Sequence, residues 1–188
     1  MPPAPERFGY YRRLSAKNRA IYRRSDAIAS LPLTDPERAR PWVDALAAAL
    51  AADDRRAVQR AAQGLATALC HDLDVPAVPV RVLARRPADA GGELHGIYVR
   101  HEDGRTLIRV WMRTAAHERV VAFRTFLRTL LHELCHHLDY ERLKLDDSYH
   151  TKGFFQRESS LVRQLAPRDE PSDDDDAPSG QLPLPGLG

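Results

Sequence analysis

A regular apolar stripe over residues 118–142 constrains the fold of this chain more than any other feature of its sequence. Apolar side chains recur there at steps of three and four residues, the spacing that places them on one face of an α-helix. They are Val120, Phe123, Leu127, Leu130, Leu134 and Leu138. The stripe predicts a long amphipathic helix in the centre of the core, with other elements packed against its apolar side.

The same predicted helix carries the sequence His132-Glu133-Leu134-Cys135-His136. Positions four residues apart lie about 40° apart around a helix axis, so His132 and His136 point the same way and can bind one metal ion. Glu133 lies about 60° from His136, close enough to reach a water molecule on that ion. Two imidazoles that hold Zn²⁺ and a carboxylate that takes a proton form a known hydrolytic arrangement. The sequence therefore predicts a catalytic zinc site with Glu133 as general base.

A catalytic zinc site has three protein ligands and one open position. The candidates for the third ligand are the acidic and histidine residues that follow on the chain: His137, Asp139, Asp146, Asp147, His150 and Glu158. His137 points about 100° away from the metal face, and Asp139 is displaced outward from it. His150 follows a polar linker and precedes the last predicted helix, so its side chain can fold back over the first two ligands. We expect His150 as the third ligand. Glu158 is the alternative, because sites with two histidines and one glutamate are also known.

The remaining periodicities predict an α+β fold with helices before and after a small sheet. Helices are expected at about 6–30, 41–52, 54–72 and 153–165, strands at about 78–83, 94–100 and 105–113, and a loop at 87–92. Asp103-Gly104, between the last two strands, is a typical hairpin turn. We therefore expect N-terminal helices, a three-stranded and mostly antiparallel sheet, the central helix with its two histidines, and a closing C-terminal helix, in a zincin-like arrangement.

Length and composition limit the organisation of the chain and its environment. The 188 residues, 43% of them apolar, suffice for one ordinary domain, and no apolar run is long enough to cross a membrane. The N-terminus has no apolar signal region and only two cysteines occur, which favours the cytoplasm. We expect a basic helical segment at 1–34, a globular domain at 35–167 and a disordered acidic tail at 168–188.

The two ends of the chain carry opposite charges. Residues 1–30 contain seven Lys or Arg against two acidic residues, and residues 168–188 contain six acidic residues against one arginine. Near the N-terminus, basic side chains are interleaved with tyrosines, a composition that can hold phosphates and stack on bases. The candidate DNA-binding residues are Arg12, Arg13, Lys17, Arg23 and Arg24. The alternative interpretation is a helix that packs its aromatic side chains on the domain and leaves its charges in water.

The segment HELCHHLDY, a short polar linker and then HTKGFF together resemble the SprT-like zinc metallopeptidases. That family has HExxH on a helix and a third histidine in a segment with a glycine and an aromatic residue. The resemblance covers about 60–165. This chain has Thr151 where the family usually has glycine, and Gly153 two residues later.

The resemblance implies a minimal zincin-like fold that binds Zn²⁺ and hydrolyses peptide bonds. The zinc ligands that it implies are His132, His136 and His150, with Glu133 as general base and then general acid. It also implies a protein substrate whose extended strand adds to an edge of the sheet. The strands around Tyr98 and Trp111 are the candidates for that edge.

The C-terminal tail ends in Gln181-Leu182-Pro183-Leu184-Pro185, which resembles the peptide that docks bacterial proteins on the replication sliding clamp. In that resemblance the anchoring residues are Gln181, Leu182 and Leu184. A short apolar motif on a polar tail is typical of a docking segment. We therefore expect the sliding clamp as a candidate partner, beside a protein substrate and DNA, and no membrane.

These features together predict a zinc-dependent endopeptidase that acts on DNA-bound or DNA-crosslinked proteins. Two alternatives stay open. One is a zinc-stabilised DNA- or clamp-binding module without turnover, and the other is a zincin protease that cleaves a transcriptional regulator. Glu133 distinguishes the binding module from an enzyme, because a structural zinc site does not need a carboxylate at that position.

Overall fold

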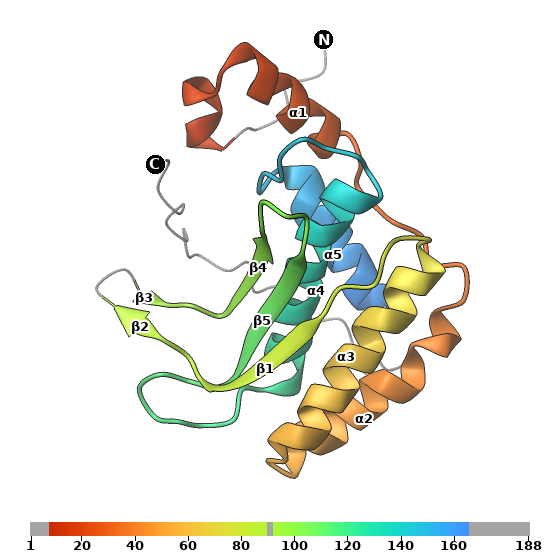
Figure 1. Cartoon of the computed structure of the whole chain (residues 1–188), viewed down its shortest axis with the longest axis vertical. Helices are drawn as coiled ribbons and strands as arrows, with labels where there is room; N and C mark the ends of the chain where they lie inside the picture. Colours follow the sequence, from red (N-terminus) through yellow and green to blue (C-terminus); the bar gives the residue numbers. More distant parts are fainter. Residues whose placement is uncertain (1–7, 90–91, 166–188) are drawn as a thin grey trace.

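A computed structural model describes residues 8–89 and 92–165 of the chain and has the α+β architecture that the sequence predicts (Figure 1). The helices are η1 (Gly9–Arg13), α1 (Ala16–Asp26), η2 (Pro36–Arg38), α2 (Arg40–Ala51), α3 (Arg55–Asp72), α4 (Phe123–Glu141) and α5 (Lys152–Leu165), of which η1 and η2 are short 3-10 turns. The strands are β1 (Val80–Arg85), β2 (Ala88–Asp89), β3 (Gly92–Glu93), β4 (Gly96–Arg100) and β5 (Thr106–Arg113).

The main sheet is mixed, with the strand order β1, β5, β4. β4 and β5 form the antiparallel hairpin predicted from Asp103-Gly104. β1 lies parallel to β5, with Val82 opposite Val110, so the expectation of a mostly antiparallel sheet is wrong for one of the two pairings. The alternation of side chains along β1 indicates a strand but carries no information about its neighbour. The chain first forms β4 and then returns as β5 between β4 and β1.

The loop expected at 87–92 is partly a second, two-stranded ribbon. β2 and β3 pair antiparallel, with Ala88 opposite Glu93. Gly92 has a φ angle of 118°, which glycine adopts without steric cost and other residues rarely adopt. The ribbon is too short for a periodic pattern in the sequence.

The N-terminal helix expected over 6–30 is divided into two pieces. η1 ends at Arg13, and the extended backbone of Leu14 separates it from α1. Ser15 caps α1, because its Oγ accepts a hydrogen bond from the backbone N–H of Asn18 at 3.1 Å. The cap satisfies one of the free N–H groups at the start of the helix.

The central helix begins at Phe123, later than its predicted start near 118. Val120 forms an antiparallel bridge with Arg113, and the N–H of Val121 donates to the carbonyl of Met112 at 2.8 Å. These residues therefore extend the sheet before the chain turns into α4.

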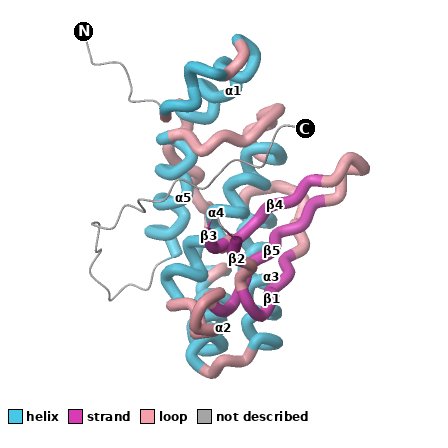
Figure 2. Tube along the Cα trace, turned by 90° about the vertical axis from the view of Figure 1, so that its left-hand side faces the viewer, coloured by secondary structure: helices cyan, strands magenta, loops and turns pink. Residues whose placement is uncertain are grey.

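The prediction that α4 is the central helix is confirmed. It contacts β4 and β5 as well as α5, and Figures 1 and 2 show it between the strands and α5. α3 packs against β1, and α2 packs against α3. The leucines of the α4 stripe, Leu130, Leu134 and Leu138, are buried in the core. The two cysteines, Cys70 and Cys135, are buried and free.

The N-terminal segment packs on the rest of the molecule at one end (Figure 1). α1 contacts α5, and its residues Ile21 and Tyr22 are buried. The predicted tail at 168–188, with its candidate clamp-docking residues Gln181, Leu182 and Leu184, lies outside the described residues. Among the helices that the structure describes, none has the length and apolarity needed to cross a membrane.

Candidate metal centre

Three histidines from different parts of the sequence converge at one point. His132 and His136 lie one turn apart on α4, and His150 lies in the loop just before α5. Nε2 of His150 is 3.0 Å from Nε2 of His132 and 3.1 Å from Nε2 of His136. In each of the three residues, one ring nitrogen lies within 4.8 Å of the others. The structure thus brings together the three residues predicted as ligands.

The donor set and its spacing fit a tetrahedral metal site. Zn–N bonds of about 2.0–2.1 Å in a tetrahedron place the ligand nitrogens roughly 3.3–3.4 Å apart. The two nitrogen pairs above are close to that spacing. Three imidazoles with a fourth position left open form the ligand set of a catalytic zinc site, and imidazole also binds other divalent transition metals.

Glu158, the alternative third ligand, lies behind His132. Its Oε2 is 2.9 Å from Nδ1 of His132, on the side of the ring away from the cluster. A carboxylate in this place accepts a hydrogen bond from Nδ1–H and so favours the tautomer whose Nε2 is free for a metal ion. The other oxygen of Glu158 is 3.4 Å from the guanidinium of Arg128. The structure therefore places Glu158 against the candidate ligand His132 and not among the three converging nitrogens.

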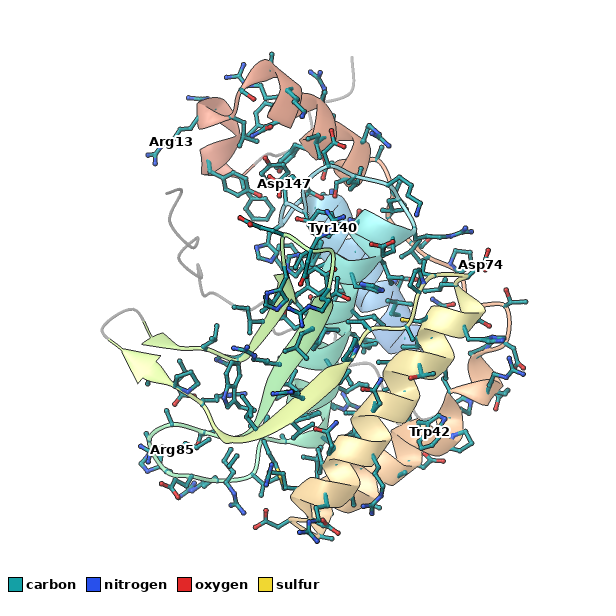
Figure 3. All side chains as sticks on the ribbon, viewed as in Figure 1. Arg13, Trp42, Asp74, Arg85, Tyr140 and Asp147 are labelled. Carbon is teal, nitrogen blue, oxygen red and sulfur yellow. The ribbon has the colours of Figure 1, made fainter. Side chains whose placement is uncertain are left out.

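The other candidate ligands have different partners. His137 contacts the carbonyl of Pro76, Asp139 contacts Arg157, Asp146 contacts Lys17, and Asp147 accepts a hydrogen bond from Tyr140. Asp147 and Tyr140 lie where the N-terminal segment meets the end of α4 (Figure 3). Within residues 8–89 and 92–165, the three histidines are the one group of His, Cys, Asp or Glu residues placed to hold a metal ion.

Packing and a hydroxyl group fix the other two imidazoles. Nδ1 of His136 is 2.7 Å from Oγ of Ser148. The ring of Phe154 lies 4.7 Å from the His136 ring between centroids, and the ring of Phe155 stacks on His150 at 5.7 Å. These contacts restrict the rotation of the imidazoles and hold their Nε2 atoms toward the common point.

Burial keeps two of the three imidazoles neutral. It lowers the pKa of His136 well below its ordinary value and the pKa of His150 to about 4, and the charge of His132 lowers both pKa values further. Burial also lowers the pKa of His132, but the hydrogen bond and charge of Glu158 and the charge of Glu133 outweigh it, so its pKa is raised. Neutral imidazole is the form that binds a metal.

The carboxyl group of Glu133 is buried between α4 and β4. The backbone N–H of Tyr98 donates a hydrogen bond to it, and the residue is only 6% exposed. Gly96 leaves the space for this group, because a Cβ atom at Gly96 would lie 2.6 Å from Oε1 of Glu133. Burial raises the pKa of Glu133 to about 7, while the charge of His132 and the Tyr98 hydrogen bond act in the opposite direction. A carboxyl group with such a pKa can both accept and release a proton near neutral pH.

The open edge of the sheet lies next to Glu133. Trp111 belongs to β5, the central strand, so its strand cannot accept another and the expectation for Trp111 is wrong. Alternate residues of β4 bond to β5, which leaves the main chain of Gly96 and Tyr98 on the outer side. Of the two candidate strands, only that of Tyr98 has an edge that no other strand of residues 8–89 and 92–165 covers.

The candidate DNA-binding residues are all exposed: Arg12, Arg13, Lys17, Arg23 and Arg24. Arg13 points away from the body of the molecule (Figure 3). The tyrosines of this segment pack inward, and the rings of Tyr10 and Tyr22 lie 6.5 and 6.3 Å from that of Tyr149. The aromatic side chains therefore serve packing, as in the alternative interpretation, and the basic side chains remain in water.

Gly96 and Ser148 are site residues that no spacing in the sequence indicates. Gly96 contacts Glu133 of α4 from β4, and Ser148 contacts His136 of α4 from the loop before α5. A glycine inside a predicted strand is a sign of close approach by another group, and this is the one signal that could have pointed to Gly96.

A scan of protein-family models and searches of curated proteins and of solved structures find no match for this chain.

Proposed function

We propose that this protein is a zinc-dependent endopeptidase that cleaves protein substrates. The observation that carries the proposal is the carboxyl group of Glu133, buried next to a three-histidine cluster and against an open sheet edge. A zinc site that only stabilises a fold is closed by four protein ligands and needs no such carboxyl group. Three imidazoles leave one position for water or substrate.

His132, His136 and His150 are the residues that would hold the zinc ion. When bound, zinc supplies a Lewis acid that polarises the scissile carbonyl and lowers the pKa of water. The protein orients two of these ligands through Nδ1, which contacts Glu158 in His132 and Ser148 in His136. These contacts direct the Nε2 lone pairs to the metal position.

Glu133 is the proton carrier. Its carboxylate takes a proton from the attacking water as the oxygen forms a bond to the scissile carbonyl carbon. The same group then gives that proton to the amide nitrogen as the C–N bond breaks, so the products are a carboxylic acid and an amine. The hydrogen bond from the Tyr98 N–H orients the carboxyl group. In the metal-free protein, burial raises the pKa of Glu133, which favours its holding and then releasing a proton.

The substrate is an extended polypeptide that adds to β4. The outward N–H of Gly96 and the outward carbonyls of Gly96 and Tyr98 offer hydrogen bonds that depend little on the side chains of the substrate, while the N–H of Tyr98 holds Glu133. A peptide in this position lies alongside Glu133. The edge therefore orients the scissile bond. His132 and His136 lie on α4 together with the base Glu133, and His150 joins them from the loop before α5.

The test combines metal content with proteolysis. Wild type, Glu133→Gln and His150→Ala are purified, their zinc is quantified, and each is incubated with unfolded casein and with a DNA-binding protein, with and without single-stranded DNA. We expect stoichiometric zinc in wild type and Glu133→Gln, and a loss of cleavage by roughly 10²–10⁴-fold in Glu133→Gln. His150→Ala should lose both zinc and cleavage, because it removes a ligand.

Two outcomes would contradict the proposal. Equal cleavage by wild type and Glu133→Gln would exclude Glu133 as the base. Zinc in both proteins and cleavage by neither would favour the zinc-stabilised binding module.

For the basic N-terminal segment we propose DNA as the partner. Its five exposed basic side chains can neutralise phosphates, and the released counterions make the affinity fall with salt. The double variant Arg12→Ala/Arg13→Ala should reduce the slope of log affinity against log salt by about two. Arg163→Ala, an exposed arginine on α5, is the matched control. An unchanged affinity and slope in the double variant would contradict DNA binding by this segment.

A further inference from the structure

Ser148 connects the metal centre to a buried carboxylate. Its Oγ lies 2.7 Å from Nδ1 of His136 and donates a hydrogen bond to Oδ2 of Asp139 at 2.8 Å. A serine hydroxyl has one hydrogen, and this hydrogen goes to the carboxylate. Oγ must then accept from Nδ1–H of His136. The contact therefore selects the tautomer of His136 whose Nε2 is free for a metal ion.

Asp139 is held in turn by Arg157. The two side chains are fully buried, and a guanidinium nitrogen of Arg157 lies 2.7 Å from Oδ1 of Asp139. Burial raises the pKa of Asp139, while the charge of Arg157 and the Ser148 hydrogen bond lower it. The guanidinium of Arg157, which does not lose its proton, lies directly beside this carboxyl group and favours its charged form. A buried ion pair of this kind is tolerated when further hydrogen bonds satisfy its remaining protons.

The end of α1 supplies such hydrogen bonds to the two terminal nitrogens of Arg157, while its buried Nε has no partner among the described residues. Arg157 donates to the backbone carbonyls of Ser25 and Ile28 and to Oγ of Ser25, the last at 2.9 Å. Carbonyl groups at a helix C-terminus carry partial negative charge and attract a cation. The charge of Arg157 is thus shared between Asp139 and the end of α1.

Gly153 allows α1 to come this close. A Cβ atom at Gly153 would lie 2.5 Å from the carbonyl oxygen of Asp26, and the Gly153 N–H donates to the side chain of Asp26 at 3.0 Å. α1 is therefore seated on the start of α5, the helix that also carries Arg157.

We infer that Ser148, Asp139 and Arg157 are positioning residues for His136, and that the end of α1 completes this relay. The inference rests on the proposed metal centre and goes beyond it. His132 is supported directly by a carboxylate, that of Glu158, whereas His136 depends on a chain of three residues that ends in the N-terminal segment. The basic segment is thereby part of the support of the metal site.

The test measures zinc affinity of the full chain by competition with a chelator. Ser148→Ala removes the hydroxyl group and should weaken zinc binding about 10–100-fold, the usual loss when the outer partner of a ligand is removed. Ser148→Thr keeps a hydroxyl group and should restore an affinity close to wild type. Ser159→Ala, at a partly exposed serine of α5, is the matched control and should leave the affinity unchanged.

A second readout separates positioning from general stability. ¹⁵N NMR of the metal-free protein reports which ring nitrogen of His136 carries the proton. We expect Nδ1–H in wild type and in Ser148→Thr, and a loss of this preference in Ser148→Ala. Arg157→Lys keeps the charge but loses the planar set of donors, so it should weaken zinc binding as well. If that variant fails to fold, the Ser148 series still decides the question.

The outcomes distinguish the inference from the proposed function. Zinc affinity and a His136 tautomer unchanged in Ser148→Ala would overturn the relay and leave the metal centre intact. A wild-type protein that binds no zinc would overturn the metal centre itself. Weaker zinc binding in Ser148→Ala, with rescue in Ser148→Thr, supports the relay even if no protein substrate is cleaved.

Discussion

The two edges of the main sheet are treated differently by the rest of the molecule. At β1, side chains of α3 cover the outward main-chain groups. Gln59 donates to the carbonyl of Val80 and accepts from the N–H of Val82, both at 2.8 Å. Gln63 accepts from the N–H of Val80 at 2.8 Å and donates to the carbonyl of Val78 at 3.2 Å. The two amides thus take the place of a neighbouring strand.

At β4, no glutamine covers the outward groups among the described residues. The N–H of Tyr98 donates instead to the carboxyl group of Glu133. An open edge can pair with another extended chain, and natural proteins usually protect such edges. This molecule protects the edge far from the histidine cluster and leaves open the edge beside Glu133. The difference directs any added strand to the candidate site.

The largest effect is expected from Gly96→Ala, which fills the space above β4. The new Cβ atom would lie 2.6 Å from Oε1 of Glu133, and this flexible end of the side chain must move. Displacement of the general base should lower proteolysis about 10²–10³-fold, with zinc content unchanged. Gly9→Ala is the control, because a Cβ atom there meets nothing within 4 Å. Wild-type activity in Gly96→Ala would show that the position of the carboxyl group is not critical.

Opening the protected edge should affect stability and not catalysis. The double variant Gln59→Leu/Gln63→Leu leaves the outward groups of β1 without their amide partners. We expect urea denaturation to show a loss of about 2–3 kcal/mol in the free energy of unfolding, from unmet hydrogen bonds. Light scattering should detect self-association through the exposed edge. If the double glutamine variant lost as much cleavage per folded molecule as Gly96→Ala, the β1 edge would also matter for catalysis, which would contradict the distinction between the two edges.

Replacing the carboxyl group by an amide makes the β4 contact resemble the β1 contacts. The folded pKa of Glu133 is about 7 and its ordinary value is 4.5, so its contribution to stability is full below pH 4.5 and is lost as the pH rises toward 7. Metal-free Glu133→Gln should therefore be more stable than metal-free wild type at pH 8 by about 3 kcal/mol, and this advantage should disappear near pH 4. Urea denaturation with a chelator present measures both proteins. An advantage independent of pH would contradict the raised pKa.

The smallest effect is expected from Arg55→Ala. Arg55 adds a hydrogen bond of 3.3 Å to the carbonyl of Val82, from an exposed position at the start of α3. Its removal should lower the free energy of unfolding by only about 0.5 kcal/mol, because the group remains hydrated. A loss as large as that of the double glutamine variant would assign the protection of β1 to Arg55 instead.

The features predicted best from the sequence are those with a local period. The leucine stripe of α4 fixes which side of the helix is buried, and helix geometry then places His132 and His136 on one face. His150 was expected from its position between a polar linker and the next helix, and the structure brings it to the other two. The histidine pair depends only on neighbours one turn apart on the helix, whereas His150 lies 14 residues beyond His136 and reaches it through the fold.

The features missed or mistaken depend on partners distant in the sequence. The parallel pairing of β1 with β5 and the central position of Trp111 follow from the order in which strands enter the sheet. The break at Leu14 and the late start of α4 follow from packing and from bridging to the sheet. A periodic pattern identifies an element but not its neighbour.

The sequence by itself determined the α+β class, the central helix, the pair of histidines one turn apart and the glutamate beside them. Only the tertiary structure decided the roles around them. Glu158, the alternative ligand, contacts Nδ1 of His132 instead. Gly96 lies against Glu133. Ser148 lies between His136 and Asp139. The physical reason is that helix periodicity is set by hydrogen bonds four residues apart. The supporting contacts instead join groups up to 132 residues apart, as between Arg157 and Ser25, and no local rule relates such positions.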